Sequence, residues 1–258
     1  MEPLPNVPDL PRPRVAGDVW RTSSGRVELR GGEVHVWRID LAGLRGAAAL
    51  ATLSDAERAR AGRFRFPGDR DRFVASHAAL RAILASCVDA APAALSFGES
   101  VHGKPFVAAP AAGRALRFSL SHSGDVALVA VSRGLEVGVD VERVRALDDL
   151  EGFAARYFSP RECAALAQIA ASDRLRAFFE TWTLKEAYLK ACGDGLARAL
   201  DAFDVTVGAA QPRLLAVRDR PGDEARWKFE RIDSGPGHAA AIAAPRDWER
   251  TRYWRGGE

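Results

Sequence analysis

The alternation of apolar and polar residues predicts two similar successions of strand, helices and strands along the chain. Residues 33–39 alternate with period two, which is typical of a half-buried strand. Ser54 and Glu57 form a capping-box pattern that begins a short helix, and residues 69–88 predict a longer one. Apolar runs then predict strands at 95–97, 116–120, 126–131 and 135–144, with a Gly103-Lys104-Pro105 corner after the first.

The second half of the chain begins with the strand at 135–144. A mostly helical block follows at 147–192, and short strand-like runs follow at 203–207, 214–217, 227–232 and 239–243. We therefore expect an α+β protein with two halves, 33–134 and 135–258. Residues 1–32 are rich in Pro, Gly and Arg, and we interpret them as an N-terminal extension that is disordered or draped over the body.

Composition and charge are those of an ordinary globular protein. The 258 residues are 47 % hydrophobic, and the formal net charge is +3. No run approaches the roughly 18–20 apolar residues of a membrane span, and the start lacks the apolar core of a signal peptide. We therefore expect a cytoplasmic protein with no membrane partner. Cys87, Cys163 and Cys192 lack metal-ligand or redox spacing, which predicts reduced cysteines.

Two carboxylates share one face of the strand predicted at 135–144. The apolar residues occupy its odd positions, so Gly138, Asp140 and Glu142 point to the opposite side. The two carboxylates are then about 7 Å apart at Cα, and both can reach one hard cation such as Mg²⁺. The alternative is a solvated polar face, because acidic residues at alternate positions are common in sheets.

Lysine is scarce in this chain, and two lysines lie in one helical stretch. Lys185 and Lys190 are two of only four lysines among 37 basic residues. On a helix that ends at Gly193, Glu186 and Lys190 share one shoulder of the apolar stripe, and Lys185 falls on the other. A lysine supplies a compact charge that suits a phosphate. A surface Glu–Lys pair at (i, i+4) spacing is the alternative.

Further polar residues could hold an anion. Ser121 and His122 lie between two predicted strands, and a protonated histidine in such a turn can donate to a phosphate. A serine hydrolase is not supported, because no G-x-S-x-G motif occurs. The six arginines between residues 58 and 72 form either a solvated helix face or an anion-binding patch.

Together these motifs resemble those of the 4′-phosphopantetheinyl transferases over residues 33–244. The matching segments are Gly103-Lys104-Pro105, Phe118–Gly124, Gly138–Glu142, Phe179–Lys190 and Gly193–Leu196. The length and layout resemble the surfactin-synthetase-activating type. That resemblance implies a monomer that forms a pseudo-dimer of two similar α+β halves, with the active site at their interface.

The resemblance also implies a reaction and its residues. The 4′-phosphopantetheine arm of coenzyme A would pass, with Mg²⁺, to a serine of an apo acyl or peptidyl carrier protein, and adenosine 3′,5′-bisphosphate would leave. Asp140, Glu142 and Glu186 would hold the metal. Glu186 would also be the base for the serine, and Lys190 would be catalytic and contact the pyrophosphate. The other coenzyme A contacts are expected at Arg60, Lys104, Ser121, His122 and Lys185.

One position departs from the family pattern. The family often has basic residues at the positions of both Glu57 and Arg60, and here the first is acidic. Arg58 or Arg63 is then the substitute expected to hold the 3′-phosphate.

Three other functions are weighed against this one. Another Mg²⁺-dependent phosphotransferase could use the same carboxylates, but no P-loop or kinase signature occurs. A non-catalytic module that binds coenzyme A or carrier proteins would tolerate loss of a metal carboxylate, and all three are present. Nucleic-acid binding is disfavoured, because acidic residues nearly balance the arginines.

Overall fold

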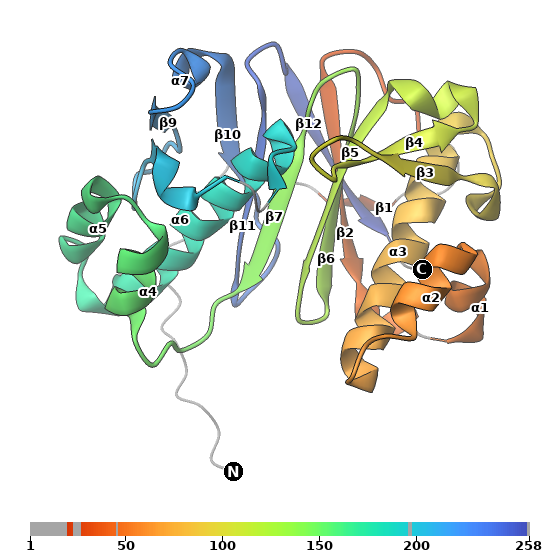
Figure 1. Ribbon diagram of the computed structural model, residues 1–258, viewed down its shortest axis with the longest axis horizontal. Helices are drawn as coiled ribbons and strands as arrows, with labels where there is room; N and C mark the ends of the chain where they lie inside the picture. The colour runs from red at the N-terminus through yellow and green to blue at the C-terminus, as the bar shows by residue number, and fades with distance from the viewer. Residues whose placement is uncertain (1–19, 23–26, 45, 196–197, 257–258) are drawn as a thin grey trace.

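The computed structural model describes residues 20–22, 27–44, 46–195 and 198–256. The predicted elements occur in the predicted order, and the structure adds short elements and a last strand that were not predicted. Short 3₁₀ turns connect the helices and strands (Figure 1). In chain order they are β1 (Arg21–Thr22), β2 (Glu33–Asp40), α1 (Ala47–Thr52), α2 (Asp55–Ala61), α3 (Pro67–Val88), β3 (Ser96–Glu99), β4 (Pro105–Ala109), β5 (Leu116–Ser123), β6 (Val126–Arg133), β7 (Gly138–Arg143), α4 (Leu150–Tyr157), α5 (Pro160–Ala167), α6 (Ala171–Cys192), β8 (Phe203–Val205), β9 (Leu214–Val217), α7 (Asp223–Arg226), β10 (Trp227–Arg231), β11 (His238–Pro245) and β12 (Arg250–Gly256).

Two sheets form the centre of this α+β fold. The larger has the strand order β1-β12-β2-β6-β5, and the smaller has the order β10-β11-β7. Helix α3 packs on one face of the larger sheet, and α6 packs on one face of the smaller (Figure 1). The opposite faces meet in a shared apolar cluster that includes Val36, Leu128, Val139 and Ile242. The two sheets therefore lie between two long helices.

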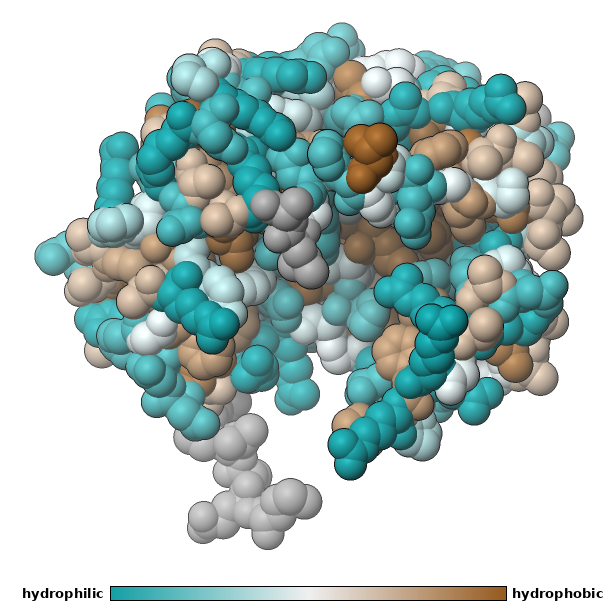
Figure 2. Space-filling model, viewed as in Figure 1, coloured by the Kyte–Doolittle hydropathy of each residue, from teal (hydrophilic) through white to brown (hydrophobic). Residues whose placement is uncertain are grey.

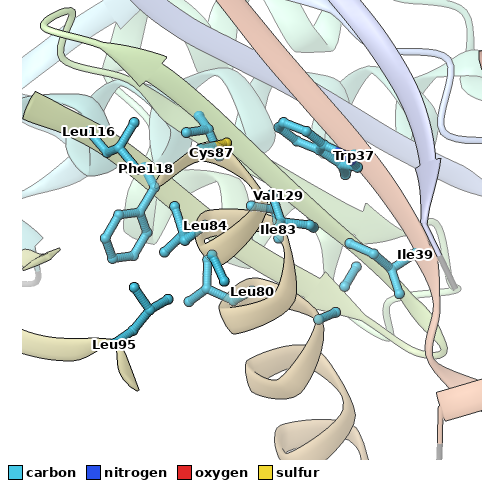
Figure 3. Packing of buried hydrophobic residues seen from close by; sticks show 14 of the residues in the cluster. Trp37, Ile39, Leu80, Ile83, Leu84, Cys87, Leu95, Leu116, Phe118 and Val129 are labelled. Carbon is cyan, nitrogen blue, oxygen red and sulfur yellow. The ribbon is translucent and has the colours of Figure 1, made fainter. Parts of the chain in front are cut away.

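Strand alternation builds the core of the first half. Trp37 and Ile39 of β2 and Val129 of β6 point to the same side as Leu116 and Phe118 of β5 (Figure 3). Leu80, Ile83, Leu84 and Cys87 of α3 fill that side. This packing holds α3 against the larger sheet, in which β5 is an edge strand.

Strand β2 is buried on both faces, so the expectation of a half-buried strand is wrong. His35 is fully buried, and its Nε2 lies 3.1 Å from a carboxylate oxygen of Glu33. Arg252 of β12 donates to the other oxygen of Glu33 at 2.9 Å. These polar residues are buried because β12 covers them and satisfies them with its own side chains.

The C-terminal strand corrects the expected boundary at 135–258. Strand β12 pairs in parallel with β2 inside the larger sheet, from Arg250 opposite Glu33 to Gly256 opposite Ile39. The last strand therefore belongs to the sheet of the first half, and the sequence pattern did not predict it. Short β1 pairs with β12, so part of the predicted extension is built into the fold. Residues 1–19 and 23–26 of that extension lie outside the described residues.

Other expectations are confirmed. Ser54 and Glu57 form a reciprocal capping box at the start of α2, and Gly193 ends α6 with a positive φ of 76°. The three cysteines are free thiols. None of the described helices is long and apolar enough to cross a membrane.

Candidate functional site

The candidate site lies where β5 and β7, the edge strands of the two sheets, run side by side (Figure 1). Three serines of β5 contact β7 through their hydroxyls. Ser119 accepts from the Val139 amide at 3.1 Å, and Ser123 accepts from the Arg143 amide at 3.0 Å. Between them, Ser121 donates to Asp140 at 2.7 Å. The alternate serines thus join the two halves of the chain beside the acidic residues of β7. In Figure 2 the surface is hollowed between the two halves.

Helix α6 covers the acidic face of β7 because a glycine lets it approach. A Cβ on Gly138 would lie 2.0 Å from the carbonyl oxygen of Ala187 and 2.4 Å from the amide of Ala191. Any side chain here would push α6 away. The face that carries Gly138 also carries Asp140, so α6 presents Glu186 and Lys190 to that carboxylate. The shared face predicted for β7 is confirmed, since Val139 lies in the cluster between the sheets.

Lys190 makes the closest ionic contact of the site. Its Nζ lies 2.6 Å from Oδ1 of Asp140 and 3.0 Å from the hydroxyl of Ser121. Asp140 is 3 % exposed, whereas the Lys190 side chain keeps 29 % of its surface. Ser123 donates to Glu142 at 2.8 Å. Lys190, Ser121 and Ser123 therefore fix the positions of Asp140 and Glu142. The ammonium side of Lys190 remains accessible to solvent.

Like charges crowd the site. Burial raises the pKa of Glu186, and Asp140 raises it further, while Lys190 lowers it. Burial also raises the pKa of Glu142, whereas the hydroxyl of Ser123 lowers it. Three carboxylates thus face the ammonium group of Lys190 and, at Glu142, the guanidinium of Arg145. This leaves an excess of negative charge that a divalent cation would balance.

The donor set fits a hard cation. Oδ2 of Asp140 is buried and has no hydrogen-bond partner in the structure, although a buried carboxylate oxygen normally has one. Magnesium binds one or two protein carboxylates and fills its remaining positions with water and phosphate oxygens. In the described part of the chain, no three His, Cys, Asp or Glu side chains already converge tightly enough to hold an ion. Asp140, Glu142 and Glu186 supply carboxylate oxygens, and their side chains would have to turn toward one another to bind one cation.

Basic side chains lie next to this cluster on the side of α2 and α3. His122 lies at the end of β5 and keeps part of its surface exposed. Partial burial of its ring lowers its pKa, and Lys190 and Arg72 lower it further. Arg60 lies over the ring of Phe73 and is exposed to solvent. Ser121 contacts Asp140 directly, and Lys190 acts electrostatically on His122. Arg60 acts on His77, which in turn neighbours His122.

His77 is a neighbour of this group that the sequence analysis did not single out. Burial lowers its pKa to about 4, and both Arg60 and His122 act on it electrostatically. Its Nδ1 is 3.0 Å from the carbonyl oxygen of Phe73. The signal in the sequence was the helical spacing of four residues between Phe73 and His77, which places both rings on one face of α3.

Lys185 does not belong to the site, which corrects the expected contact with coenzyme A. Its side chain is fully buried, and its Nζ lies 2.6 Å from both carboxylate oxygens of Glu162 in α5. It also donates to the carbonyl oxygen of Phe203 at 2.7 Å. Lys185 lies on the opposite side of α6 from Lys190, as the helical spacing predicted, but there it joins α6 to α5 and β8.

Lys104 is also engaged elsewhere. Its Nζ donates to Glu136 at 2.6 Å and to the carbonyl oxygen of Ala191 at 2.8 Å, in the last turn of α6. A cation is favourable beside the carbonyl groups at a helix C-terminus. Instead of a free phosphate contact, the structure shows Lys104 fastening the loop before β4 to α6 of the other half.

Glu57 has a structural role that accounts for its departure from the family pattern. It accepts from the amide of Ser54 at 2.8 Å, and its carboxylate lies 2.7 Å from the Nη2 of Arg81. Arg81 is 1 % exposed and also donates to the carbonyl oxygens of Pro92 and Leu95. Glu57 therefore neutralises a buried arginine. Arg58 and Arg60 both remain exposed on the last turn of α2, and Arg58 pairs with Asp55.

Comparisons with known proteins match both halves of the chain. The model of the 4′-phosphopantetheinyl transferase superfamily matches residues 136–243, which include β7 and α6. The model of the 4′-phosphopantetheinyl transferase N-terminal domain matches residues 44–134.

Individual relatives cover most of the chain. The 4′-phosphopantetheinyl transferase HetI of Nostoc sp. is 40 % identical over 239 residues, which are 91 % of this chain and 97 % of that protein. A putative 4′-phosphopantetheinyl transferase of Synechocystis sp. is 35 % identical over 69 % of this chain and 71 % of its own length. The crystal structure of the Thermotoga maritima holo-[acyl-carrier-protein] synthase matches with a TM-score of 0.35 and 23 % identity, over 43 % of this chain and 63 % of that chain. Since the family matches span both halves and a relative is 40 % identical over nearly its whole length, the chain belongs to the 4′-phosphopantetheinyl transferase superfamily.

Proposed function

We propose that this protein transfers the 4′-phosphopantetheine arm of coenzyme A to a serine of an apo acyl or peptidyl carrier protein. The serine oxygen forms a bond to the pantetheine-side phosphorus, the bond from that phosphorus to the bridging oxygen breaks, and adenosine 3′,5′-bisphosphate leaves. The observation that supports this most directly is the cluster of one buried and two half-buried carboxylates with Lys190 between the two halves. Its position within the matched family segment adds to this support.

Glu186 is suited to remove the serine proton. A general base works best when its pKa approaches the working pH, and burial and Asp140 both raise the pKa of Glu186. Glu186 is half-buried on α6, so an attacking hydroxyl could still approach it. It would take the proton as the oxygen–phosphorus bond forms.

Lys190 would bind the pyrophosphate. Its ammonium group keeps part of its surface exposed beside Asp140 and would move little to contact a phosphate oxygen. A fixed positive charge there stabilises the negative charge that develops on the leaving oxygen. His122 and Arg60 lie on the side where the adenosine phosphates would then be held.

Mg²⁺ is the cofactor that the donor set favours. Asp140, through its unpartnered Oδ2, and Glu142 would hold it, with Glu186 as the third carboxylate. When bound, it would neutralise charge on the pyrophosphate. The protein would act as a monomer, because both halves of the site come from one chain.

The test is transfer of the arm itself. The full-length protein is incubated with coenzyme A, Mg²⁺ and a panel of apo acyl and peptidyl carrier proteins, and intact masses are measured. We expect one carrier class to gain a single phosphopantetheine on its serine. Asp140→Asn should lower the rate at least about a hundredfold. Asp148→Asn, which changes an exposed aspartate, should not.

Coenzyme A binding separates the alternatives. If the protein bound coenzyme A but no carrier gained the arm, the chain would be a binding module. Full activity of Asp140→Asn would contradict the role proposed for the carboxylates.

A further inference from the structure

Ser123, the last residue of β5, bridges the backbone of β7 and a side chain of the same strand. Its hydroxyl accepts from the Arg143 amide at 3.0 Å and donates to Oε2 of Glu142 at 2.8 Å. A hydroxyl has one proton, so the bond from Arg143 occupies an acceptor side and leaves that proton directed at the carboxylate. Two hydrogen bonds in sequence also strengthen each other. Ser123 therefore holds the Glu142 carboxylate in one orientation.

The register between β5 and β7 brings serines and carboxylates together in pairs. Ser121 with Asp140 and Ser123 with Glu142 are both separated by 19 residues, so the two strands run in the same direction. Alternate residues of a strand point to one side, and the hydroxyls of β5 thus recur at the same interval as the carboxylates of β7. The two strands belong to different sheets, and these side-chain contacts connect them.

Each carboxylate of β7 is held through only one of its oxygens. Lys190 and Ser121 both contact Oδ1 of Asp140, and Oδ2 has no hydrogen-bond partner. Among the described residues, the side-chain hydrogen bond of Glu142 uses Oε2 and leaves Oε1 unused. One oxygen of each carboxylate thus fixes the group, and the other remains for a ligand.

Ser119 makes only half of the contacts that Ser123 makes. It accepts from the Val139 amide at 3.1 Å, and in the described part of the chain it donates to no carboxylate. Val139 itself packs in the apolar cluster between the sheets. Ser119 therefore joins β5 to β7 without orienting an acidic group, which makes it an internal comparison for Ser123.

We propose that Ser123 is a positioning residue for the metal, because it holds Oε2 of Glu142 and leaves Oε1 to bind the cation together with Asp140. This inference rests on the metal site of the proposed function. Residues that orient a metal ligand typically contribute about 10- to 100-fold to metal affinity. Without the hydroxyl, the half-buried Glu142 side chain would have to be ordered when the cation binds, at a cost in entropy.

Metal binding can be measured without turnover. The full-length protein is mixed with coenzyme A, without a carrier protein, and titrated with Mn²⁺, whose free form is followed by electron paramagnetic resonance. Mn²⁺ accepts the same oxygen ligands as Mg²⁺. Ser123→Ala should weaken the Kd for Mn²⁺ at least about tenfold. Ser123→Thr keeps the hydroxyl and should stay within about threefold of the wild type, whereas Ser123→Val, which has the same shape without the hydroxyl, should bind as weakly as Ser123→Ala.

Ser119→Ala is the matched control. It loses one amide contact with β7, as Ser123→Ala does, but none with a carboxylate, so its Kd for Mn²⁺ should stay within about twofold of the wild type. Amide hydrogen exchange checks that each change is local. We expect faster exchange at Arg143 in Ser123→Ala and at Val139 in Ser119→Ala.

Three results would overturn the proposal. An equal loss of Mn²⁺ affinity in Ser119→Ala and Ser123→Ala would show that a looser contact between the halves is the cause. An unchanged Kd in Ser123→Ala would reject the role of Ser123 and leave the proposed function intact. If the wild-type protein with coenzyme A bound no Mn²⁺, the metal site of the proposed function would itself be wrong, and the role of Ser123 with it.

Discussion

At the residue scale, the candidate site is a set of like charges held close together by hydrogen bonds. Lys190 and Ser121 use one oxygen of Asp140, and the other oxygen is buried without a partner. Glu142 and Glu186 each have a raised pKa, with burial as the first cause. This arrangement destabilises the protein without a cation, as is common where function requires charges that folding alone would not favour.

The neutral isostere of Glu186 separates stability from activity. Because the folded protein disfavours the charged form of Glu186, Glu186→Gln should raise the melting temperature by roughly 1–3 °C in EDTA. Transfer to a carrier serine should fall by about 10² to 10⁴ while coenzyme A still binds. Calorimetric melting and single-turnover transfer on the same variant measure both effects. Near-normal turnover would show that Glu186 is not the base.

At the element scale, the two faces of α6 make different contacts, one with the candidate site and one with α5. Towards β7 it presents Glu186 and Lys190, and towards α5 it presents Lys185 to Glu162. The close approach at Gly138 allows the first contact, and the capping box of Ser159 with Glu162 positions the second. Glu162 also accepts from the amide of Val205 at 2.7 Å, which ties β8 to the same carboxylate.

Lys185 should therefore matter for stability. Lys185→Met removes one partner of a buried pair and should destabilise the fold by about 3–5 kcal/mol, while the Kd for coenzyme A stays within about twofold. Urea unfolding and calorimetry test these two statements. Lys190→Met is the comparison variant. It should impair both coenzyme A binding and transfer, and it should also lower stability, because it leaves the buried Asp140 carboxylate without its ammonium partner. A large loss of coenzyme A affinity in folded Lys185→Met would restore the role first expected for Lys185.

The pairing of β2 with β12 depends on pH through Glu33. Hydrogen bonds from Arg252 lower the pKa of Glu33 to about 2, from an ordinary value of 4.5. Because the folded pKa is the lower one, this stabilisation is complete above about pH 4.5 and is lost as the pH falls towards 2. Glu33→Gln should lower the free energy of unfolding at pH 7 by about 1–3 kcal/mol, and by less at pH 3.

Urea unfolding at both pH values measures this effect. The exposed Glu99→Gln is the control and should change little at either pH. An equal cost of Glu33→Gln at pH 7 and pH 3 would show that the ionised carboxylate is not the cause.

At the scale of the whole molecule, the last strand of the chain pairs with the first two strands. Strand β12 lies between β1 and β2, and Trp254 stacks on Trp37 with ring centroids 6.3 Å apart. The first half therefore completes its sheet only after the second half has been synthesised. A strand from the second half thus completes the sheet of the first half. The sheet completed in this way includes β5, which holds the carboxylates of β7 beside it.

Truncation tests that dependence. A chain that ends at Glu249 lacks all of β12 and exposes His35 and the edge of β2. We expect it to be insoluble or to unfold without a cooperative transition. A chain that ends at Gly256 keeps every pair of β12 with β2 and should melt as the full chain does. Circular dichroism with temperature distinguishes the two, and a stable, active protein ending at Glu249 would contradict this view of the fold.

The sequence by itself determined the order of most elements and the composition of the site. Period-two alternation placed Asp140 and Glu142 on one face of β7, and helical spacing placed Glu186 and Lys190 together, because both periodicities are local properties of the backbone. The capping box of α2 and the glycine end of α6 are equally local signals.

Only the tertiary structure decided which charges face the site. Lys185 and Lys190 are equally basic in the sequence, but the packing of α5 buries the first and β7 receives the second. Lys104 and Glu57 likewise found partners that lie 87 and 24 residues away, in Ala191 and Arg81. The placement of β12 depends on pairing with a strand more than 200 residues earlier. Such contacts depend on how the whole chain packs, and no local pattern encodes them.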